Sequence, residues 1–279
     1  KKGLFVIFMI LLLCILFFFI SNYHITISRQ RVACKKASAH ACPLSIVQIS
    51  DLHNQNFGLR QAILCKKIQA LRPDLIAVTG DLVDHAPYQH AMAFMKHVSK
   101  LCPVYYVRGN HECLAGNYEK QELLLHSFGV TILKNESAVF TKDGRTYQIT
   151  GLDDPIFQGL DANYMSLVKK TLDHLQASLP QQPSACPDFQ ILLAHRPELF
   201  HLYSSYPYDL VLCGHAHGGQ FRLPGIGGLY APNQGIFPRY TSGLHRENGT
   251  AEIISRGLGN SSFPLRLFNF PEIVHVLVQ

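Results

Sequence analysis

The chain of 279 residues is 47% hydrophobic and 16% charged, with a formal net charge of +6 at pH 7. This length is sufficient for one large domain with a substantial core, and no repeat or low-complexity tract divides the chain. The net charge is modest and the basic residues are not interleaved with aromatic ones, which argues against nucleic acid as a partner.

An uncharged apolar run occupies residues 3–20, directly behind two N-terminal lysines. Its length is close to the minimum for a helix that crosses a bilayer. Because no Ala-x-Ala-like cleavage site follows, we favour an uncleaved transmembrane anchor over residues 1–22, with a cleaved signal peptide as the alternative. The two lysines favour a cytoplasmic N-terminus, whereas Arg29 and Arg31 behind the run favour the opposite orientation. We therefore expect a single-pass protein of the cell membrane, on a side that these charges leave open.

Residues 23–43 are polar, basic and rich in small side chains. We interpret this segment as a tether that connects the anchor to a globular body of residues 44–279. Basic residues in this position would also lie against anionic lipid headgroups.

In the first half of the body, short β-rich apolar runs alternate with segments of helical periodicity. In chain order we expect strand, helix, strand, helix and strand at 45–49, 59–71, 75–79, 88–101 and 104–107. Strands that are apolar along their whole length are typical of a parallel sheet that is covered on both faces.

The second half of the body contains short strands separated by hairpin-like turns, followed by a helix and further apolar strands. Strands are expected at 130–133, 137–141, 146–150, 190–194, 209–213 and 274–278, and helices at 118–127 and 163–179. The change of pattern indicates a second sheet. The fold class is therefore α/β, with two packed sheets and helices outside them.

Polar side chains directly follow five of the expected strands. The motifs are Asp51-Leu-His53, Gly80-Asp81-Leu-Val-Asp84, Gly109-Asn110-His111-Glu112, Ala194-His195 and Gly214-His215-Ala-His217. Any one motif also fits a turn, a helix cap or a surface histidine pair, but all five together indicate one site at the carboxyl edge of the sheet. Carboxylate, imidazole and amide ligands suit two divalent metal ions, with Mn²⁺, Fe or Zn²⁺ favoured over Ca²⁺ or Mg²⁺.

The order of these motifs resembles the calcineurin-like metallophosphoesterase superfamily over the whole body from Ile46 to the C-terminal strand. The segments 215–220, 224–225 and 257–259, together with the tether, resemble its membrane-associated bacterial YkuE-like branch. The resemblance implies a four-layer α-β-β-α sandwich of two mixed sheets flanked by helices. It also implies hydrolysis of a phosphoester or pyrophosphate bond by a metal-bound hydroxide.

The resemblance assigns metal binding to three residues around a first ion, three around a second ion and one that bridges both. In that order these residues are Asp51, His53 and His217; Asn110, His195 and His215; and Asp81. His111 would act at the leaving group as a general acid or charge stabiliser, and Asp84 would hold it in place.

These features lead to the hypothesis of a membrane-tethered phosphohydrolase with two metal ions and a phosphate-ester or pyrophosphate substrate. The anchor suggests a lipid-linked substrate such as UDP-2,3-diacylglucosamine, although soluble lipid A pyrophosphate hydrolases of the superfamily carry Arg where this chain has His111. The alternatives are a non-catalytic scaffold of the same fold and a nuclease of the superfamily. Candidates for contacting a substrate phosphate are Arg239, Arg246, Arg256 and Arg266.

Overall fold

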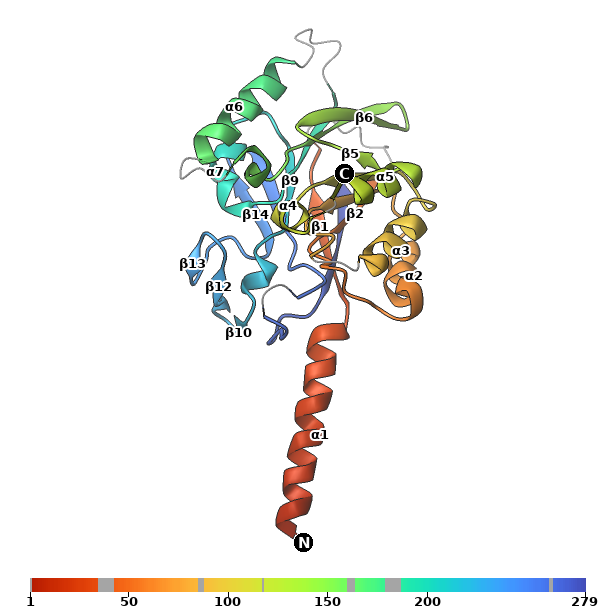
Figure 1. Ribbon diagram of the computed structural model, residues 1–279. Coiled ribbons are helices and arrows are strands. Elements are labelled where there is room, and N and C mark those ends of the chain that lie inside the picture. The colour runs from red at the N-terminus through yellow and green to blue at the C-terminus, as the bar shows by residue number, and fades with distance from the viewer. Residues whose placement is uncertain are drawn as a thin grey trace.

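The computed structural model describes residues 2–34, 43–84, 88–116, 118–159, 164–178, 187–260 and 263–279. Two six-stranded sheets pack together, and helices cover their outer faces (Figure 1). The α/β class and the arrangement of two mixed sheets flanked by helices, as expected from the sequence, are confirmed.

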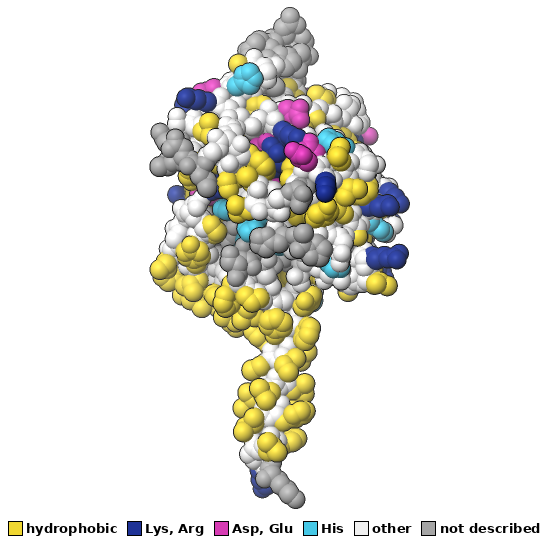
Figure 2. Space-filling model, in the orientation of Figure 1, with side chains coloured by type: hydrophobic (Ala, Val, Ile, Leu, Met, Phe, Trp, Pro, Cys, Tyr) yellow, Lys and Arg dark blue, Asp and Glu magenta, His cyan; other side chains and the backbone are white. Residues whose placement is uncertain are grey.

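A single long helix, α1 (Lys2–Tyr23), projects from the body (Figure 1). It is long and apolar enough to cross a membrane. Its apolar side chains are exposed along its length (Figure 2), whereas Ser21 and Asn22 at its C-terminal end are buried. The C-terminal end of the helix is therefore held by the body, whereas most of its apolar part is exposed.

The first sheet has the strand order β1-β16-β2-β3-β4-β5. These strands are β1 (Thr26–Val32), β16 (Glu272–Val278), β2 (Leu44–Ile49), β3 (Leu75–Thr79), β4 (Val104–Val107) and β5 (Thr131–Ile132). Strands β2 to β5 are parallel, β16 is antiparallel to β2, and β1 is parallel to β16. The first three motifs follow β2, β3 and β4. These strands are neighbours and end at the same edge of the sheet.

The second sheet has the strand order β14-β15-β9-β8-β7-β6. These strands are β14 (Gly243–Glu247), β15 (Thr250–Ile254), β9 (Leu210–Cys213), β8 (Phe189–Leu193), β7 (Arg145–Gly151) and β6 (Glu136–Lys142). The four central strands are parallel, and the two edge strands are antiparallel to their neighbours. Strands β8 and β9, which precede the last two motifs, lie side by side.

Helices cover the outer face of each sheet. Those of the first half are α2 (Ala62–Ala70), α3 (Gln89–Val98), α4 (Asn110–Leu114) and α5 (Tyr118–Ser127), and those of the second are α6 (Tyr164–Ala177) and α7 (Phe200–Tyr203). In α3 the buried residues recur at helical spacing, with Ala91, Met95 and Val98 on the face toward the sheet. This amphipathic pattern is what allowed the helix to be expected from the sequence.

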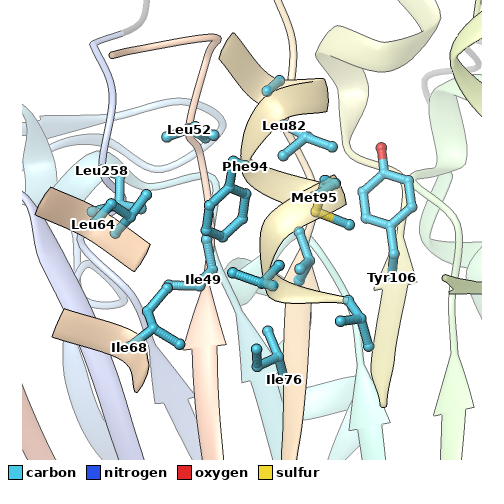
Figure 3. Close-up of a cluster of buried hydrophobic side chains, with 14 of the residues drawn as sticks. Ile49, Leu52, Leu64, Ile68, Ile76, Leu82, Phe94, Met95, Tyr106 and Leu258 are labelled. Atoms are coloured by element: carbon cyan, nitrogen blue, oxygen red, sulfur yellow. The ribbon is translucent and has the colours of Figure 1, made fainter. Parts of the chain in front are cut away.

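Buried side chains form separate apolar layers between these elements. Alternation along β2 places Ile46 between the two sheets, whereas Val47 and Ile49 pack on the side of α2 and α3. Figure 3 shows Ile49, Phe94 and Met95 in the layer between the first sheet and its helices. Because both faces of the strand are buried, four of its six residues are apolar, and the buried amide of Gln48 donates to Thr79 and to the backbone oxygen of Cys213.

The structure corrects one expectation about the N-terminal region. Residues 26–32, which we assigned to a tether outside the body, form the edge strand β1, in register with β16 from Thr26↔Glu272 to Val32↔Val278. Within this segment only Val32 is fully buried, and Ile25 is buried directly before it. An edge strand needs little apolar surface, so its polar sequence was mistaken for a linker. The remainder of the predicted tether, at 35–42, lies outside the described residues.

Short elements complete the fold around the lower part of the second sheet in Figure 1. Two small hairpins pair β10 (Arg222–Leu223) with β11 (Gly227–Gly228) and β12 (Tyr230–Ala231) with β13 (Gly235–Ile236). The 3-10 turns are η1 (Leu59–Gln61), η2 (Pro155–Gln158), η4 (Pro197–Leu199) and η5 (His217–Gly219).

Candidate functional site

The five polar motifs meet at the carboxyl ends of strands from both sheets. In the first sheet they follow β2, β3 and β4, and in the second they follow β8 and β9. A hydrogen bond joins the two sheets here, since Nδ1 of His195 lies 2.8 Å from the backbone oxygen of Thr79. A carbonyl oxygen can only accept, so Nδ1 donates and Nε2 of His195 is left as a potential metal ligand.

A first group of potential ligands consists of Asp51, His53, Asp81 and His217, whose ligand atoms all lie within 4.8 Å of one another. Nε2 of His53 lies 3.1 Å from Nε2 of His217 and 3.7 Å from Oδ2 of Asp81. Oδ1 of Asp51 lies 3.4 Å from Nε2 of His217. All four residues are buried.

A second group contains Asp81 again, together with His195 and His215, within the same 4.8 Å limit. Nε2 of His195 lies 3.2 Å from Oδ2 of Asp81 and also 3.2 Å from Oδ1 of Asn110. The amide oxygen of Asn110 therefore belongs to this second group. Asp81 is the one residue that both groups share.

The spacing of these atoms fits metal coordination. Ligand atoms at about 2.1 Å from one cation lie about 3 Å apart when they subtend a right angle. The separations between His53, His217 and Asp51 are close to that value. In addition, Nε2 of His215 is buried and has no hydrogen-bond partner among the described residues. A buried lone pair without a donor, beside a shared carboxylate, is what a cation at this position would satisfy.

His111 and Asp84 lie beside these groups but are more exposed. Nδ1 of His111 is 2.8 Å from Oδ1 of Asp84, and Nε2 of His111 is 4.0 Å from Oδ2 of Asp81. The backbone N–H of His111 also donates to Oδ1 of Asp81. These contacts turn Nε2 of His111 toward the two groups. The distance limit that defines the two ligand groups is also met by a third set, His53, Asp84 and His111. In this set, the hydrogen bond between His111 and Asp84 explains why those two residues lie close together.

Five of the seven predicted ligands adopt a backbone conformation that non-glycine residues rarely take. Positive φ angles occur at Asp51 (50°), His53 (46°), Asp81 (51°), His215 (64°) and His217 (46°). Each left-handed residue costs about 1 kcal/mol or more, and such strain concentrates at functional sites. No sequence signal identified these angles, apart from the glycines that adjoin Asp81, His215 and His217.

Gly80 allows the turn between β3 and Asp81 to form. Its φ is 88°, and a Cβ atom here would lie 2.5 Å from Nδ1 of His195 and 2.7 Å from the backbone N of Gly109. Both distances are too short for any side chain. The absence of a side chain at Gly80 is therefore a condition for bringing Asp81, Gly109 and His195 together.

Glu112 has a structural role that the sequence analysis did not identify. Its carboxylate accepts hydrogen bonds from the backbone N–H groups of Asp81 (2.9 Å), Leu82 (2.6 Å), Val83 (3.3 Å) and Gly109 (2.7 Å). Glu112 is completely buried. One carboxylate thus fixes the turn that carries Asp81 relative to the turn that carries the next motif. Its position at the third residue of a helix after Gly109 is the signal that could have indicated this role.

Three of the four arginines proposed to contact a substrate phosphate have other partners. The buried guanidinium of Arg266 donates to the backbone oxygens of Arg256 and Gly259. Arg256 forms an ion pair with Glu272 at 3.0 Å. Arg239 stacks on the ring of Tyr240. These contacts give Arg266 and Arg256 a role in supporting the loop behind the site.

Burial and mutual charge determine the protonation of the metal-free site. Burial raises the pKa of Asp81, but the adjacent His195 outweighs it and holds that pKa well below its usual range. Burial opposes charging His195, but Asp81 raises the pKa of His195 to about 10. Burial raises the pKa of Asp51 to about 6, lowers that of His53 to about 4, and lowers that of His215 well below its usual range. The site therefore holds a neutral His53 and His215, as metal binding requires, but must release a proton from His195.

Comparison with known proteins gives the family. The model of the calcineurin-like phosphoesterase family matches residues 44–219, which contain all five motifs. The chain belongs to this family. The residues for a dinuclear metal site are present in the fold, and the chain is a metal-dependent phosphoester hydrolase by family membership.

Two relatives are similar over most of their length. The chain is 32% identical over 237 residues to the uncharacterized metallophosphoesterase YkuE of Bacillus subtilis, covering 82% of this chain and 76% of the relative. It is 32% identical over 254 residues to phosphodiesterase YaeI of Escherichia coli, covering 88% and 85%. The solved structure of the Haemophilus influenzae NAD nucleotidase NadN superimposes with a TM-score of 0.52 at 17% identity, over 78% of this chain and 46% of that one. At this identity the superposition supports the fold alone.

Proposed function

We propose that this metallophosphoesterase is a membrane-anchored enzyme that uses two divalent cations to hydrolyse a phosphodiester or pyrophosphate bond. The observation that carries the proposal is that two groups of buried ligands share Asp81. None of the seven predicted ligands is missing from the chain, which argues against the alternative of a non-catalytic scaffold. α1 would be the anchor, and the catalytic body would comprise residues 44–279 with β1 added to its edge.

The roles of the ligands follow from the two groups. Asp51, His53 and His217 would hold the first cation, as the distances between their atoms support. The second cation would be held by Asn110, His195 and His215. Mn²⁺, Fe or Zn²⁺ suits this mixture of nitrogen and oxygen donors. When bound, such a pair acts as a Lewis acid on the phosphoryl group and lowers the pKa of a water molecule.

His111 is the group that we assign to the leaving-group oxygen. Its hydrogen bond to Asp84 fixes the orientation of the ring and leaves Nε2 facing the site. From that position Nε2–H would donate its proton as the bond to the leaving group breaks. Asp84 would act through His111 by holding Nδ1–H, and would not contact the substrate itself.

The substrate is proposed from chemistry and position together. The apolar helix α1 and the similarity to a protein named a phosphodiesterase support an amphiphilic phosphodiester or pyrophosphate, such as UDP-2,3-diacylglucosamine. A nuclease would need a basic groove along the site. The charged groups close to the proposed ligands include acidic ones, Asp84 and the buried Glu112, and the guanidinium of Arg266 already donates to backbone oxygens, so we do not favour nucleic acid.

The test uses the full chain in detergent, first treated with a chelator and then supplied with Mn²⁺. We expect hydrolysis of bis(4-nitrophenyl) phosphate and UDP-2,3-diacylglucosamine only after Mn²⁺ is restored. His111→Ala should keep its metal content but lose about 10²–10⁴-fold in turnover with a poor leaving group, and lose less with 4-nitrophenolate. His126→Ala, on the exposed surface of α5, is the matched control. Loss of metal from His111→Ala would contradict the assigned role, and inactivity with bound Mn²⁺ would contradict the proposed function.

A further inference from the structure

Large apolar side chains are exposed on the face of the body from which α1 leaves. They come from three segments far apart in the sequence: the turn into α2, the β10–β11 hairpin and the loop before β16. We call this set the apolar rim; it comprises Leu59, Ile63, Leu223, Ile226, Phe263 and Phe268. Figure 2 shows hydrophobic side chains gathered on this lower face around the base of the helix. A monomeric soluble protein rarely exposes a contiguous apolar surface of this kind without a partner.

Direct contacts place the rim against the helix. The ring of Phe268 lies 5.9 Å from that of Phe17 in α1, and the ring of Tyr23 lies 6.3 Å from that of Phe57, two residues before Leu59. Phe268 also lines one hollow together with Leu223 and Ile226. Phe268, and through it the β10–β11 part of the rim, is therefore continuous with the apolar surface of α1, and Leu59 follows the segment that contacts Tyr23.

The position of Phe17 gives the depth of the rim relative to the apolar run. Phe17 precedes Ile20, the last residue of that run, by three residues, which corresponds to about 4.5 Å along a helix axis. Phe268, beside Phe17, therefore lies below the end of the apolar run. Segments that lie in a membrane interface bury their apolar face by about 5–10 Å. A bilayer crossed by α1 would reach the rim.

The end of α1 is fixed to the body, so the rim and the helix keep one orientation. Asn22 is buried, and its Oδ1 accepts a hydrogen bond of 2.8 Å from Nδ2 of Asn260. The backbone N–H of Thr26 then donates to the oxygen of Pro271 at 2.8 Å. These hydrogen bonds hold the rim at the base of the helix.

The composition of the rim favours lipid as its partner. The segments 57–63, 221–230 and 263–268 contain no Asp or Glu. Of their three arginines, Arg266 is buried and Arg222 is half-buried, which leaves Arg60 at the surface. Arg60 is exposed next to Leu59. Apolar side chains with arginine at their margin are typical of surfaces that insert among lipids and attract anionic headgroups.

The candidate metal site lies directly above this surface. The backbone oxygen of Asp51 accepts a hydrogen bond of 2.6 Å from the N–H of Gly259. The next residue, Asn260, is the one that holds Asn22 at the end of α1. Two adjacent residues of one loop, Gly259 and Asn260, therefore connect the end of β2, where the proposed ligand Asp51 lies, to the end of α1.

We propose that the apolar rim is a docking surface for a lipid bilayer, and that it seats the metal site at the level of the headgroups. This proposal rests on the proposed anchoring through α1 and deepens the proposed function. A substrate with acyl chains could reach the site with its chains still in the bilayer, whereas the phosphoryl group would meet the ligands beside β2. The substrate class is then a phosphodiester or pyrophosphate that carries lipid chains.

The chain contains no tryptophan, so single Trp substitutions each give one fluorescence signal. We would place Phe268→Trp or Ile226→Trp in the rim, Leu12→Trp in α1 as the anchor probe, and Val139→Trp on β6 as the distal control. Each of these positions is exposed. The full chain is reconstituted into vesicles of phosphatidylcholine and phosphatidylglycerol, with and without bromine on the acyl chains. We expect the bromolipid to quench the rim and anchor probes, and to leave the distal probe unchanged.

The outcomes distinguish insertion of the rim into the bilayer from insertion of the anchor. Quenching at Leu12→Trp without quenching at Phe268→Trp and Ile226→Trp would overturn the docking surface and leave the anchor intact. No quenching at Leu12→Trp would overturn both. A rim probe that is shifted to the blue but is not quenched would be covered by a second copy or another protein, which also overturns the proposal. Hydrolysis of bis(4-nitrophenyl) phosphate by each variant reports on the fold and on the proposed function independently of depth.

Discussion

Replacing Gly80 by alanine tests how strictly the turn after β3 assembles the site. The new alanine would have to adopt a left-handed φ of 88°, and its Cβ would lie 2.5 Å from Nδ1 of His195. An ordinary contact is about 3.5 Å, so His195 or the turn at Gly109 must move by about 1 Å. Backbone strain and overpacking together should destabilise the protein by about 3 kcal/mol. A shift of this size in His195 should also lower turnover by about 10²-fold.

Gly144 provides the matched control. It lies in the β6–β7 turn with a similar φ of 76°, but a Cβ atom there would have no other atom within 4 Å. Gly144→Ala should therefore cost only the backbone strain of about 1 kcal/mol and leave activity unchanged. Urea unfolding, metal content and hydrolysis of bis(4-nitrophenyl) phosphate are measured for both variants. Equal stability and equal metal content of the two variants would show that the close approach to His195 does not restrict position 80.

Two further changes test the support and the protonation of the site. Glu112→Ala removes the acceptor for four buried N–H groups and should lower the free energy of unfolding by more than about 3 kcal/mol. The control, Glu119→Ala on the exposed face of α5, should change the free energy of unfolding little. Equal unfolding midpoints in urea for the two variants would contradict the role of Glu112. Because Asp81 raises the pKa of His195 to about 10 in spite of burial, His195 is protonated at neutral pH without metal, so a cation must displace that proton. The affinity for Mn²⁺ should accordingly increase with pH up to about 10. Calorimetry at pH 7.5 in two buffers of different ionisation enthalpy should detect the release of a proton on binding. Identical heats of binding in both buffers would show that no proton leaves.

The sequence was sufficient to predict the strands that are buried on both faces. Strands β2, β3 and β4 are mostly apolar because helices cover one side and the second sheet covers the other. Their polar successors Asp51, Asp81 and Asn110 therefore stand out in the sequence. The geometry groups these residues with the histidines after β8 and β9, although their metal binding is still a prediction.

The sequence did not indicate the features that depend on partners far along the chain. The sequence of β1 alone resembles a polar linker, because its hydrogen-bond partner β16 lies more than two hundred residues later in the chain. The role of Glu112 depends on backbone N–H groups about thirty residues earlier. The apolar rim is divided among three segments, so no single window around Leu59, Ile226 or Phe268 indicates a surface. Such features arise from tertiary contact and carry no local periodicity.

We infer that Asp81 is shared by two cations. Electron paramagnetic resonance of the full chain loaded with Mn²⁺ tests this directly, because two Mn²⁺ ions that share a carboxylate are coupled magnetically whereas separate ions are not. We predict a coupled spectrum from the unmodified chain and its loss in Asp81→Ala. An active, unmodified chain that gives only the spectrum of isolated Mn²⁺ ions would contradict the account.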